Sequence, residues 1–180
     1  TKQKLFEVYH INDKPFKPKT KEKVLNKVKS IIKDYDLVIV TDYGHGLMDK
    51  ELIDYVCQNS KFLAVNTQAN AGNHGFNCIT KYPRADYVCI AHRELELTLR
   101  ERNCLPVEHI QRLSDECEYT NIMVTNGKSG SLTFKPTEGI INVPAFAYKV
   151  RDRVGAGDSV LAITSLCMAQ NVPAEIAGFI

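Results

Sequence analysis

Short runs of branched apolar residues alternate with amphipathic stretches along most of this 180-residue chain. The expected strands are residues 36–41, 62–66, 87–91, 121–125, 131–134 and 139–143, and an alternating stretch at 5–11 adds a further strand. The expected helices are residues 20–33, 49–58, 93–102, 107–119 and 155–170. Runs such as Val38-Ile39-Val40 have no polar face, which is typical of parallel strands buried on both sides. The pattern therefore predicts one α/β domain with a mainly parallel sheet and helices on its faces.

Composition excludes several other classes of protein. The chain is 44% apolar and 24% charged, and no apolar run reaches the 18 residues that a membrane span needs. Its first residues are charged and lack the apolar core of a signal peptide. The six cysteines form no CxxC pair and the five histidines have no zinc-ligand spacing. We therefore expect reduced thiols, a cytoplasmic location and no structural metal.

The N-terminal part of the chain is basic. Residues 1–33 hold ten lysines against three acidic residues, which could indicate a nucleic-acid partner. Apolar side chains at 24, 25, 28, 31 and 32 instead form one stripe of a helix, with the lysines on the opposite face. No aromatic residues are interleaved with these lysines. A solvated helix face is the favoured interpretation, and no nucleic-acid partner is expected.

Residues 67–82 are predicted to form a polar loop. The loop contains glycines and the asparagines Asn70, Asn73 and Asn77, with Asn66 at its edge. It is long for a connection between packed elements, and long loops in compact domains are often functional.

The segment Gly155-Ala156-Gly157-Asp158 precedes a long apolar helix and is the strongest candidate for chemistry. Its glycines allow a sharp turn and a close approach of the backbone to a ligand. The amides of residues 155–157 would lie unpaired at a helix N-terminus, which favours anions. A carboxylate at Asp158 suits a base that removes a proton while these amides hold developing negative charge. The alternative is an ordinary first-turn aspartate that complements the helix dipole.

Four segments, in order along the chain, resemble motifs of the ribokinase/PfkB carbohydrate kinase family, and within it the heptose 7-phosphate kinase domains. The first is Asp42-Tyr43-Gly44-His45-Gly46, which is similar to Asp-Tyr-x-Lys-Gly, and the second is Glu94, which matches the glutamate of Asn-x-x-Glu. The third is Val124-Thr125-Asn126-Gly127-Lys128-Ser129-Gly130, which is similar to Val-Thr-x-Gly-x-x-Gly. The fourth is Asp152 with Gly155-Ala156-Gly157-Asp158, which resembles the C-terminal signature. The resemblance implies the C-terminal part of a ribokinase-like three-layer α/β/α fold. It also implies an ATP-dependent sugar or sugar-phosphate kinase.

The same resemblance assigns roles to individual residues. Asp158 would be the catalytic base, and Gly155, Ala156 and Gly157 would form the anion hole. Nucleotide binding would fall to Glu94, Thr125, Gly127 and Gly130, Mg²⁺ would be bound through water near Glu94, and K⁺ would bind near Asp152. The substrate-side candidates are Asp42, His45 and Asn66.

Several positions depart from the family pattern. Ala91 replaces the asparagine of Asn-x-x-Glu, His45 replaces a lysine, and residues 66–68 replace Asp-Pro-Lys. Arg153 and Val154 replace the usual residues before the glycine turn. Each change removes a polar or charged group, so the alternative function is a weakened or non-catalytic module that binds sugar phosphate or nucleotide.

The resemblance covers only part of a kinase of this family. The N-terminal half with the sugar site is not visible in the sequence, so residues 1–180 are expected to form one partial kinase domain of a longer chain. On its own this part is expected to show little turnover, because the acceptor hydroxyl would not be held near Asp158. The resemblance also allows a homodimer and a fused nucleotidyltransferase domain.

Overall fold

The computed structural model describes residues 6, 8, 16–70, 72–73, 75–102, 105–146 and 155–179. Its α-helices are α1 (Pro18–Ile31), α2 (Lys50–Asn59), α3 (His92–Leu99), α4 (Pro106–Glu116), α5 (Ala156–Ala169) and α6 (Ala174–Phe179). Its strands are β1 (Val38–Asp42), β2 (Leu63–Thr67), β3 (Arg84–Ala85), β4 (Tyr87–Ala91), β5 (Glu118–Tyr119), β6 (Ile122–Thr125), β7 (Ser131–Lys135) and β8 (Gly139–Val143). Short 3-10 turns lie at Ile32–Asp34, Ile79–Lys81 and Gly127–Ser129.

Six strands form one mainly parallel sheet in the order β1-β2-β4-β6-β7-β8. The first four are parallel, whereas β7 and β8 continue the sheet as antiparallel strands. Asp42 pairs with Thr67, and Ala91 pairs with Thr125. The carboxyl ends of the parallel strands therefore lie along one edge, where ligands of open α/β sheets bind.

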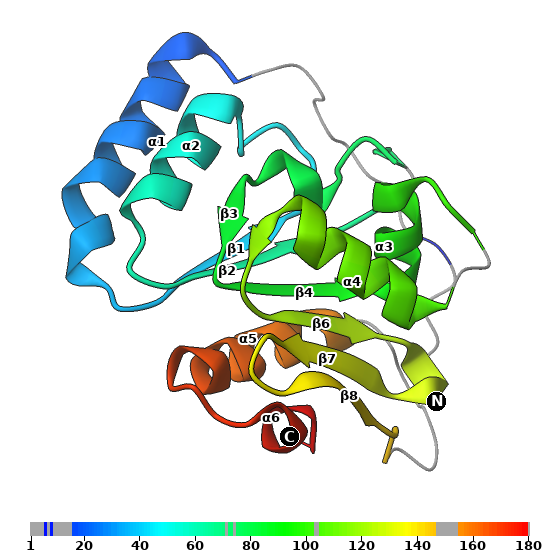
Figure 1. Ribbon diagram of the computed structural model, residues 1–180. Coiled ribbons are helices and arrows are strands. Elements are labelled where there is room, and N and C mark those ends of the chain that lie inside the picture. Colours follow the sequence, from blue (N-terminus) through cyan, green and yellow to red (C-terminus); the bar gives the residue numbers. More distant parts are fainter. Residues whose placement is uncertain are drawn as a thin grey trace.

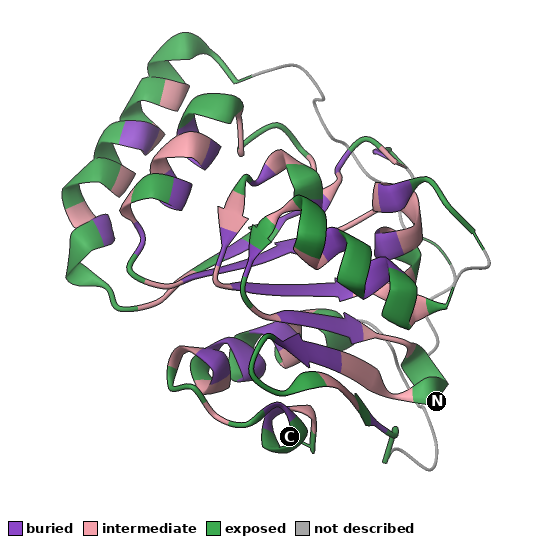
Figure 2. Ribbon diagram, viewed as in Figure 1, coloured by how far each residue is buried: buried purple, intermediate pink, exposed green. Residues whose placement is uncertain are grey.

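Helices cover both faces of this sheet (Figure 1). On β2, Leu63 and Val65 face the core that α2, α3 and α4 complete. Ala64 points the opposite way, into a second core with Leu161 of α5 and Ala177 of α6. Every residue of β2 is buried, which explains its unbroken apolar start. Figure 2 shows the same division, with buried strands between helices whose outer sides are exposed. The predicted three-layer α/β/α architecture is thus confirmed.

The lysine-rich helix behaves as an amphipathic surface element. Leu25 of α1 and the following Ile32 are buried against Leu52 and Val56 of α2. Most of its lysines lie on the exposed side, as the apolar stripe predicts. Across the described parts of the chain, no helix combines the length and apolar character that crossing a membrane requires.

The observed elements differ from the expected ones at one helix and in one additional small sheet. The helix expected at 107–119 ends at Glu116, because Tyr119 belongs to β5 and donates its hydroxyl to the carbonyls of Ile79 and Tyr82. Strands β3 and β5 form a separate two-stranded parallel sheet that the sequence pattern does not indicate. The strand expected at 5–11 lies almost wholly outside the described residues.

Candidate active site

Asp158 lies where α5 begins, within reach of two loops at the carboxyl edge of the sheet. Its Oδ1 accepts a hydrogen bond from the Tyr43 hydroxyl, at 3.1 Å, and one from Gln68 Nε2, at 2.8 Å. Tyr43 follows β1 and Gln68 follows β2, and these neighbouring strands end in register. The sheet therefore brings together three side chains that are far apart in sequence.

The two donors leave the second carboxylate oxygen of Asp158 open. Among the described residues, nothing bonds to Oδ2, and the side chain is half-buried. Burial, and then the hydrogen bond to Asp158, raise the pKa of Tyr43, so its hydroxyl remains a donor at neutral pH. Asp158 is thus held through Oδ1 while Oδ2 can accept a proton from a ligand.

Unpaired backbone amides lie in the first turn of α5, the same turn that carries Asp158. Gly155 caps the helix with a φ of 75°, in the left-handed region that glycine favours. The amides of Ala156, Gly157 and Asp158 have no bonding partner among the described residues. A Cβ added at Gly155 or Gly157 would meet no atom within 4 Å, so the space in front of this turn is open. The geometry suits an anion at the helix N-terminus.

Glu94 lies in the first turn of α3, close to the same loop. Its Oε2 accepts the Ala91 amide at 2.8 Å, and its Oε1 accepts the Ala69 amide at 3.0 Å. Burial raises the pKa of Glu94, although both backbone hydrogen bonds favour the charged form. Gln68 and Ala69 therefore connect the Asp158 carboxylate with the Glu94 carboxylate through consecutive residues.

Comparison with known proteins decides the family. The model of the pfkB family of carbohydrate kinases matches residues 21–179, which is most of the chain. The chain belongs to the pfkB family.

Two curated relatives carry the name bifunctional protein HldE. The protein of Campylobacter jejuni is 28% identical over 145 residues, which cover 78% of this chain and 30% of the relative. That of Nitratiruptor is 26% identical over 169 residues, which cover 93% of this chain and 35% of the relative. This pfkB chain thus spans about a third of the length of these relatives.

Solved structures share the fold at lower identity. Phosphofructokinase-2 from Escherichia coli in complex with potassium has a TM-score of 0.75 at 17% identity, covering 91% of this chain and 53% of that one. Ribokinase from Thermotoga maritima has a TM-score of 0.63 at 15% identity, covering 83% and 48% of the two chains. The ribokinase-like fold expected for a pfkB protein is thereby confirmed.

The residues of this pfkB chain that are predicted to bind nucleotide, at 125–130, fall into two groups. Thr125 and Gly127 line a pocket between the ends of β4 and β6 and the helix α3. Gly130 has a φ of 86°, and a Cβ there would lie 2.0 Å from the Val143 carbonyl oxygen. Close backbone packing therefore accounts for Gly130, which the resemblance places among the nucleotide-binding residues.

The three substrate-side candidates differ in position. Asp42 is buried and its carboxylate bonds to the Tyr82 hydroxyl, at 2.6 Å, and to Lys81 Nζ, at 2.5 Å. Asn66 is also buried and donates to the Cys89 carbonyl. The side chains of Asp42 and Asn66 thus face the protein interior, and their assignment to the substrate side stays a prediction. His45 is exposed and open to a ligand.

The asparagine-rich loop explains the conformation of the segment after β1. Asn70 and Asn73 both donate to the Tyr43 carbonyl, and Asn77 donates to the Asp42 carbonyl. Gly44 packs so tightly on Asn73 that a Cβ at residue 44 would lie 2.2 Å from the side-chain nitrogen Nδ2 of Asn73. The loop thus holds the backbone that presents the Tyr43 hydroxyl to Asp158.

Two cation sites are expected from the resemblance, one for Mg²⁺ near Glu94 and one for K⁺ near Asp152. Within the described ranges, no group of three or more His, Cys, Asp or Glu side chains could hold a metal ion directly. Glu94 uses one lone pair of each oxygen for a backbone amide, so it fits a contact to a water ligand of Mg²⁺ rather than a place in a direct ligand cluster. Asp152, the K⁺ candidate, lies outside the described residues together with Arg153 and Val154.

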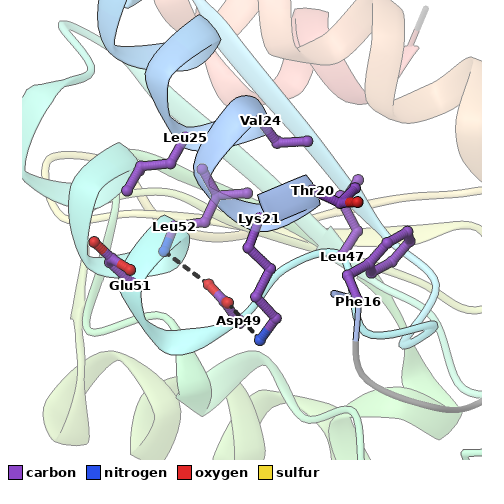
Figure 3. Close-up of a pocket in the computed structure, with 9 residues that line it drawn as sticks. All are labelled: Phe16, Thr20, Lys21, Val24, Leu25, Leu47, Asp49, Glu51 and Leu52. Atoms are coloured by element: carbon purple, nitrogen blue, oxygen red, sulfur yellow. Dashed lines mark hydrogen bonds and ion pairs between the residues drawn. The ribbon is translucent and has the colours of Figure 1, made fainter. Parts of the chain in front are cut away.

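A hollow between the first turns of α1 and α2 contains none of the predicted site residues (Figure 3). Lys21 Nζ reaches Asp49 at 2.8 Å, and Asp49 also accepts the Leu52 amide as the N-cap of α2. Lys21 and Asp49 are therefore paired with each other, and the contact fixes the helix that follows the Asp42–Gly46 loop.

We expect this ion pair to give a defined pH dependence. The hydrogen bond from Lys21, followed by that from the Leu52 amide, holds the pKa of Asp49 below its usual range. A carboxyl with a lowered folded-state pKa stabilises above its unfolded pKa and loses that contribution as pH falls through the folded value. Asp49→Asn keeps an N-cap, so at neutral pH it should cost at most about 1 kcal/mol. Urea unfolding should show this gap closing in acid, and a gap that widens in acid would contradict the assignment.

The N-cap of α3 suggests a stabilising change. Ala91 has the extended backbone of an N-cap, and its amide already bonds to Glu94, but its side chain offers no acceptor. Ala91→Asn supplies that acceptor and should raise the free energy of unfolding by about 1 kcal/mol. Chemical denaturation measures the change, with Ala91→Val as a control that adds volume without an acceptor. Equal stabilities of the two variants would rule out the capping explanation.

Proposed function

We propose that this chain is the catalytic part of an ATP-dependent sugar or sugar-phosphate kinase. The proposal is supported most directly by one arrangement: the open Oδ2 of Asp158 beside the unpaired amides of Ala156 and Gly157. Membership of the pfkB carbohydrate kinase family supports the same chemistry. An ordinary first-turn aspartate would not need two donors from separate loops on one of its oxygens.

In the proposed reaction, Oδ2 of Asp158 takes the proton of the acceptor hydroxyl as its oxygen attacks the γ-phosphorus of ATP. The bond to the β–γ bridging oxygen breaks, and ADP leaves. The amides at the start of α5 stabilise the negative charge on the transferred group. Tyr43 and Gln68 keep Asp158 oriented by their hydrogen bonds to Oδ1.

Two cations belong to this proposal. Mg²⁺ would neutralise charge on the phosphates, and Glu94 would hold one of its water ligands. K⁺ would bind beside the anion hole near Asp152, and a structural relative is described in complex with potassium.

The finer substrate proposal is a heptose 7-phosphate, supported by the Asp42–Gly46 segment and by the relatives named HldE. A fused nucleotidyltransferase domain, a homodimer and a cytoplasmic location complete the proposal. The chain spans only about a third of those relatives, so the acceptor is best sought with the full-length protein.

A thermal-shift experiment on the full-length protein tests this substrate proposal. Melting should rise with ATP–Mg²⁺, and again with a heptose 7-phosphate, because a ligand that binds only the folded state stabilises it. Fructose 6-phosphate and ribose serve as comparison acceptors. A larger rise with either of them would replace heptose as the preferred acceptor, and no response to ATP–Mg²⁺ would contradict a kinase.

A further inference from the structure

Lys81 ends the 3-10 turn at Ile79–Lys81, and neither the motifs nor the proposed transfer step uses it. Its Nζ lies 2.5 Å from Asp42 Oδ2 and 2.5 Å from Asn77 Oδ1. The side chain of Lys81 is 30% exposed, and that of Asp42 only 4%. A buried carboxylate that loses its cation is strongly destabilising, so this ion pair fixes the end of β1 against the turn.

Asp42 passes this constraint to the backbone around Tyr43. Its Oδ1 accepts the Gly44 amide, at 2.9 Å, so the carboxylate bonds to the residue on the far side of Tyr43. Its Oδ2 also accepts the Tyr82 hydroxyl, at 2.6 Å. The carboxylate is thus held by three donors, which include Lys81, and both neighbours of Tyr43 depend on it.

Asn77 passes the same constraint to the loop after β2. Its Nδ2 donates to the Asp42 carbonyl, at 2.7 Å, and to the Gln68 carbonyl, at 3.2 Å. The Gln68 amide donates to the same Asp42 carbonyl, at 2.9 Å. Because Lys81 bonds to the oxygen of the Asn77 amide, its nitrogen is turned toward these two carbonyls.

Both donors to Oδ1 of Asp158 therefore lead back to one cation. These donors are the Tyr43 hydroxyl and Gln68 Nε2, and the backbone at each is held by a side chain that Lys81 bonds. We infer that Lys81 is a positioning residue for Asp158, acting through the loops that follow β1 and β2. Its effect on the rate rests on the proposed function, whereas its effect on the loops does not.

A second lysine provides a matched comparison for an ion pair that only stabilises the fold. The side chain of Lys135 is 6% exposed, and its Nζ bonds to Glu138, at 2.9 Å, and to Asn171, at 3.0 Å. These contacts tie β7 to the turn beyond the last residue of α5, at the opposite end of that helix from Asp158. Loss of either lysine should lower stability, but only loss of Lys81 should reach Asp158.

Steady-state kinetics of the full-length protein test the inference at a temperature where each variant is folded. Lys81→Met should lower kcat for sugar phosphorylation by about 10-fold or more, because a small misplacement of a catalytic group slows the reaction strongly. KM for ATP should stay within about 2-fold, since the amides at the start of α5 are untouched. Lys81→Arg keeps the charge, so its kcat should lie closer to wild type. Lys135→Met should melt lower with the kcat of wild type.

A double-mutant cycle shows whether Lys81 acts through the two donors. The variant Tyr43→Phe/Gln68→Leu lacks both hydrogen bonds to Oδ1 of Asp158. In this background Lys81→Met should change kcat by less than about 2-fold, because residues that act through shared partners are not additive.

Hydrogen exchange, followed by mass spectrometry, tests the loops without kinase activity. The amides of Gly44 and Gln68 both bond to Asp42, and they should exchange at least about 10-fold faster in Lys81→Met. Peptides from β6 should exchange as in wild type. Asn77→Ala is the second variant, because it removes the bond to the Gln68 carbonyl without leaving a buried charge unpaired. It should speed exchange at the Gln68 amide even where Lys81→Met does not fold.

The inference is overturned if Lys81→Met exchanges at these amides as wild type does, or if Asn77→Ala does so where Lys81→Met does not fold. It is also overturned if Lys135→Met loses as much kcat, or if Lys81→Met loses as much kcat in the Tyr43→Phe/Gln68→Leu background. A wild-type protein that phosphorylates no sugar would contradict the kinase proposal, while faster exchange in Lys81→Met would still support the positioning. The two failures are therefore distinguishable.

Discussion

Asp158→Asn is expected to lower sugar phosphorylation by the full-length protein by about 100-fold or more, the usual loss when a general base is removed. The asparagine oxygen can still accept the hydrogen bonds from Tyr43 and Gln68, so the side chain should keep its position. Its nitrogen replaces Oδ2 and cannot take the proton of the acceptor. Binding of ATP should survive, because the amides at the start of α5 remain and a negative charge near the phosphates is removed.

Steady-state kinetics and thermal melting of the same variant separate catalysis from stability. If Asp158 only complements the helix dipole, turnover would be unchanged and stability would fall by about 0.3–1 kcal/mol. Glu51→Gln is the matched control, because it removes an exposed first-turn carboxylate from α2, away from Asp158. Equal turnover in wild type and Asp158→Asn would remove Asp158 from the mechanism.

Gly130→Ala is expected to destabilise the protein by more than about 3 kcal/mol, within the range of severe single substitutions. The new Cβ would lie 2.0 Å from the Val143 carbonyl oxygen and 2.7 Å from the carbonyl carbon of Pro144. Both are backbone atoms, so relief requires β7 and the end of β8 to separate. The left-handed φ of 86° adds a further cost for any side chain.

Gly139→Ala isolates the contribution of the clash. Gly139 has a φ of 73°, but a Cβ there would meet no atom within 4 Å. This control should therefore lose only about 1 kcal/mol, from backbone strain alone. Urea unfolding compares the two variants, and similar losses at both positions would contradict the close packing at Gly130.

The sequence predicts most of the large sheet because its strands are buried on both faces. The run at 87–91 has no polar side to confuse its assignment, and it forms β4 with those bounds. The small sheet of β3 and β5 could not be predicted, since two-residue strands have no periodicity. Its position depends on the Tyr119 hydroxyl reaching two carbonyls on a distant turn. Local patterns carry no information on such a contact.

In the candidate site, too, the local features could be predicted from the sequence and the long-range contacts could not. Gly155 and Asp158 could be singled out because the turn and the following helix are local features. The bonds from Tyr43 and Gln68 could not, because they depend on which strands are neighbours. A signal was present, because both residues lie two positions beyond the end of a predicted parallel strand. The burial of Asp42 depends on the distant Tyr82, and its motif alone gives no sign of it.

The central claim is that this chain moves a phosphoryl group from ATP to a sugar hydroxyl with Asp158 as the base. The most direct test incubates the full-length protein with γ-labelled ATP, Mg²⁺ and heptose 7-phosphate, and then measures label in the sugar product by mass spectrometry. The account predicts a labelled sugar bisphosphate with wild type and about 100-fold less with Asp158→Asn. Binding of both ligands without any labelled sugar from wild type would contradict it and would favour a non-catalytic binding module.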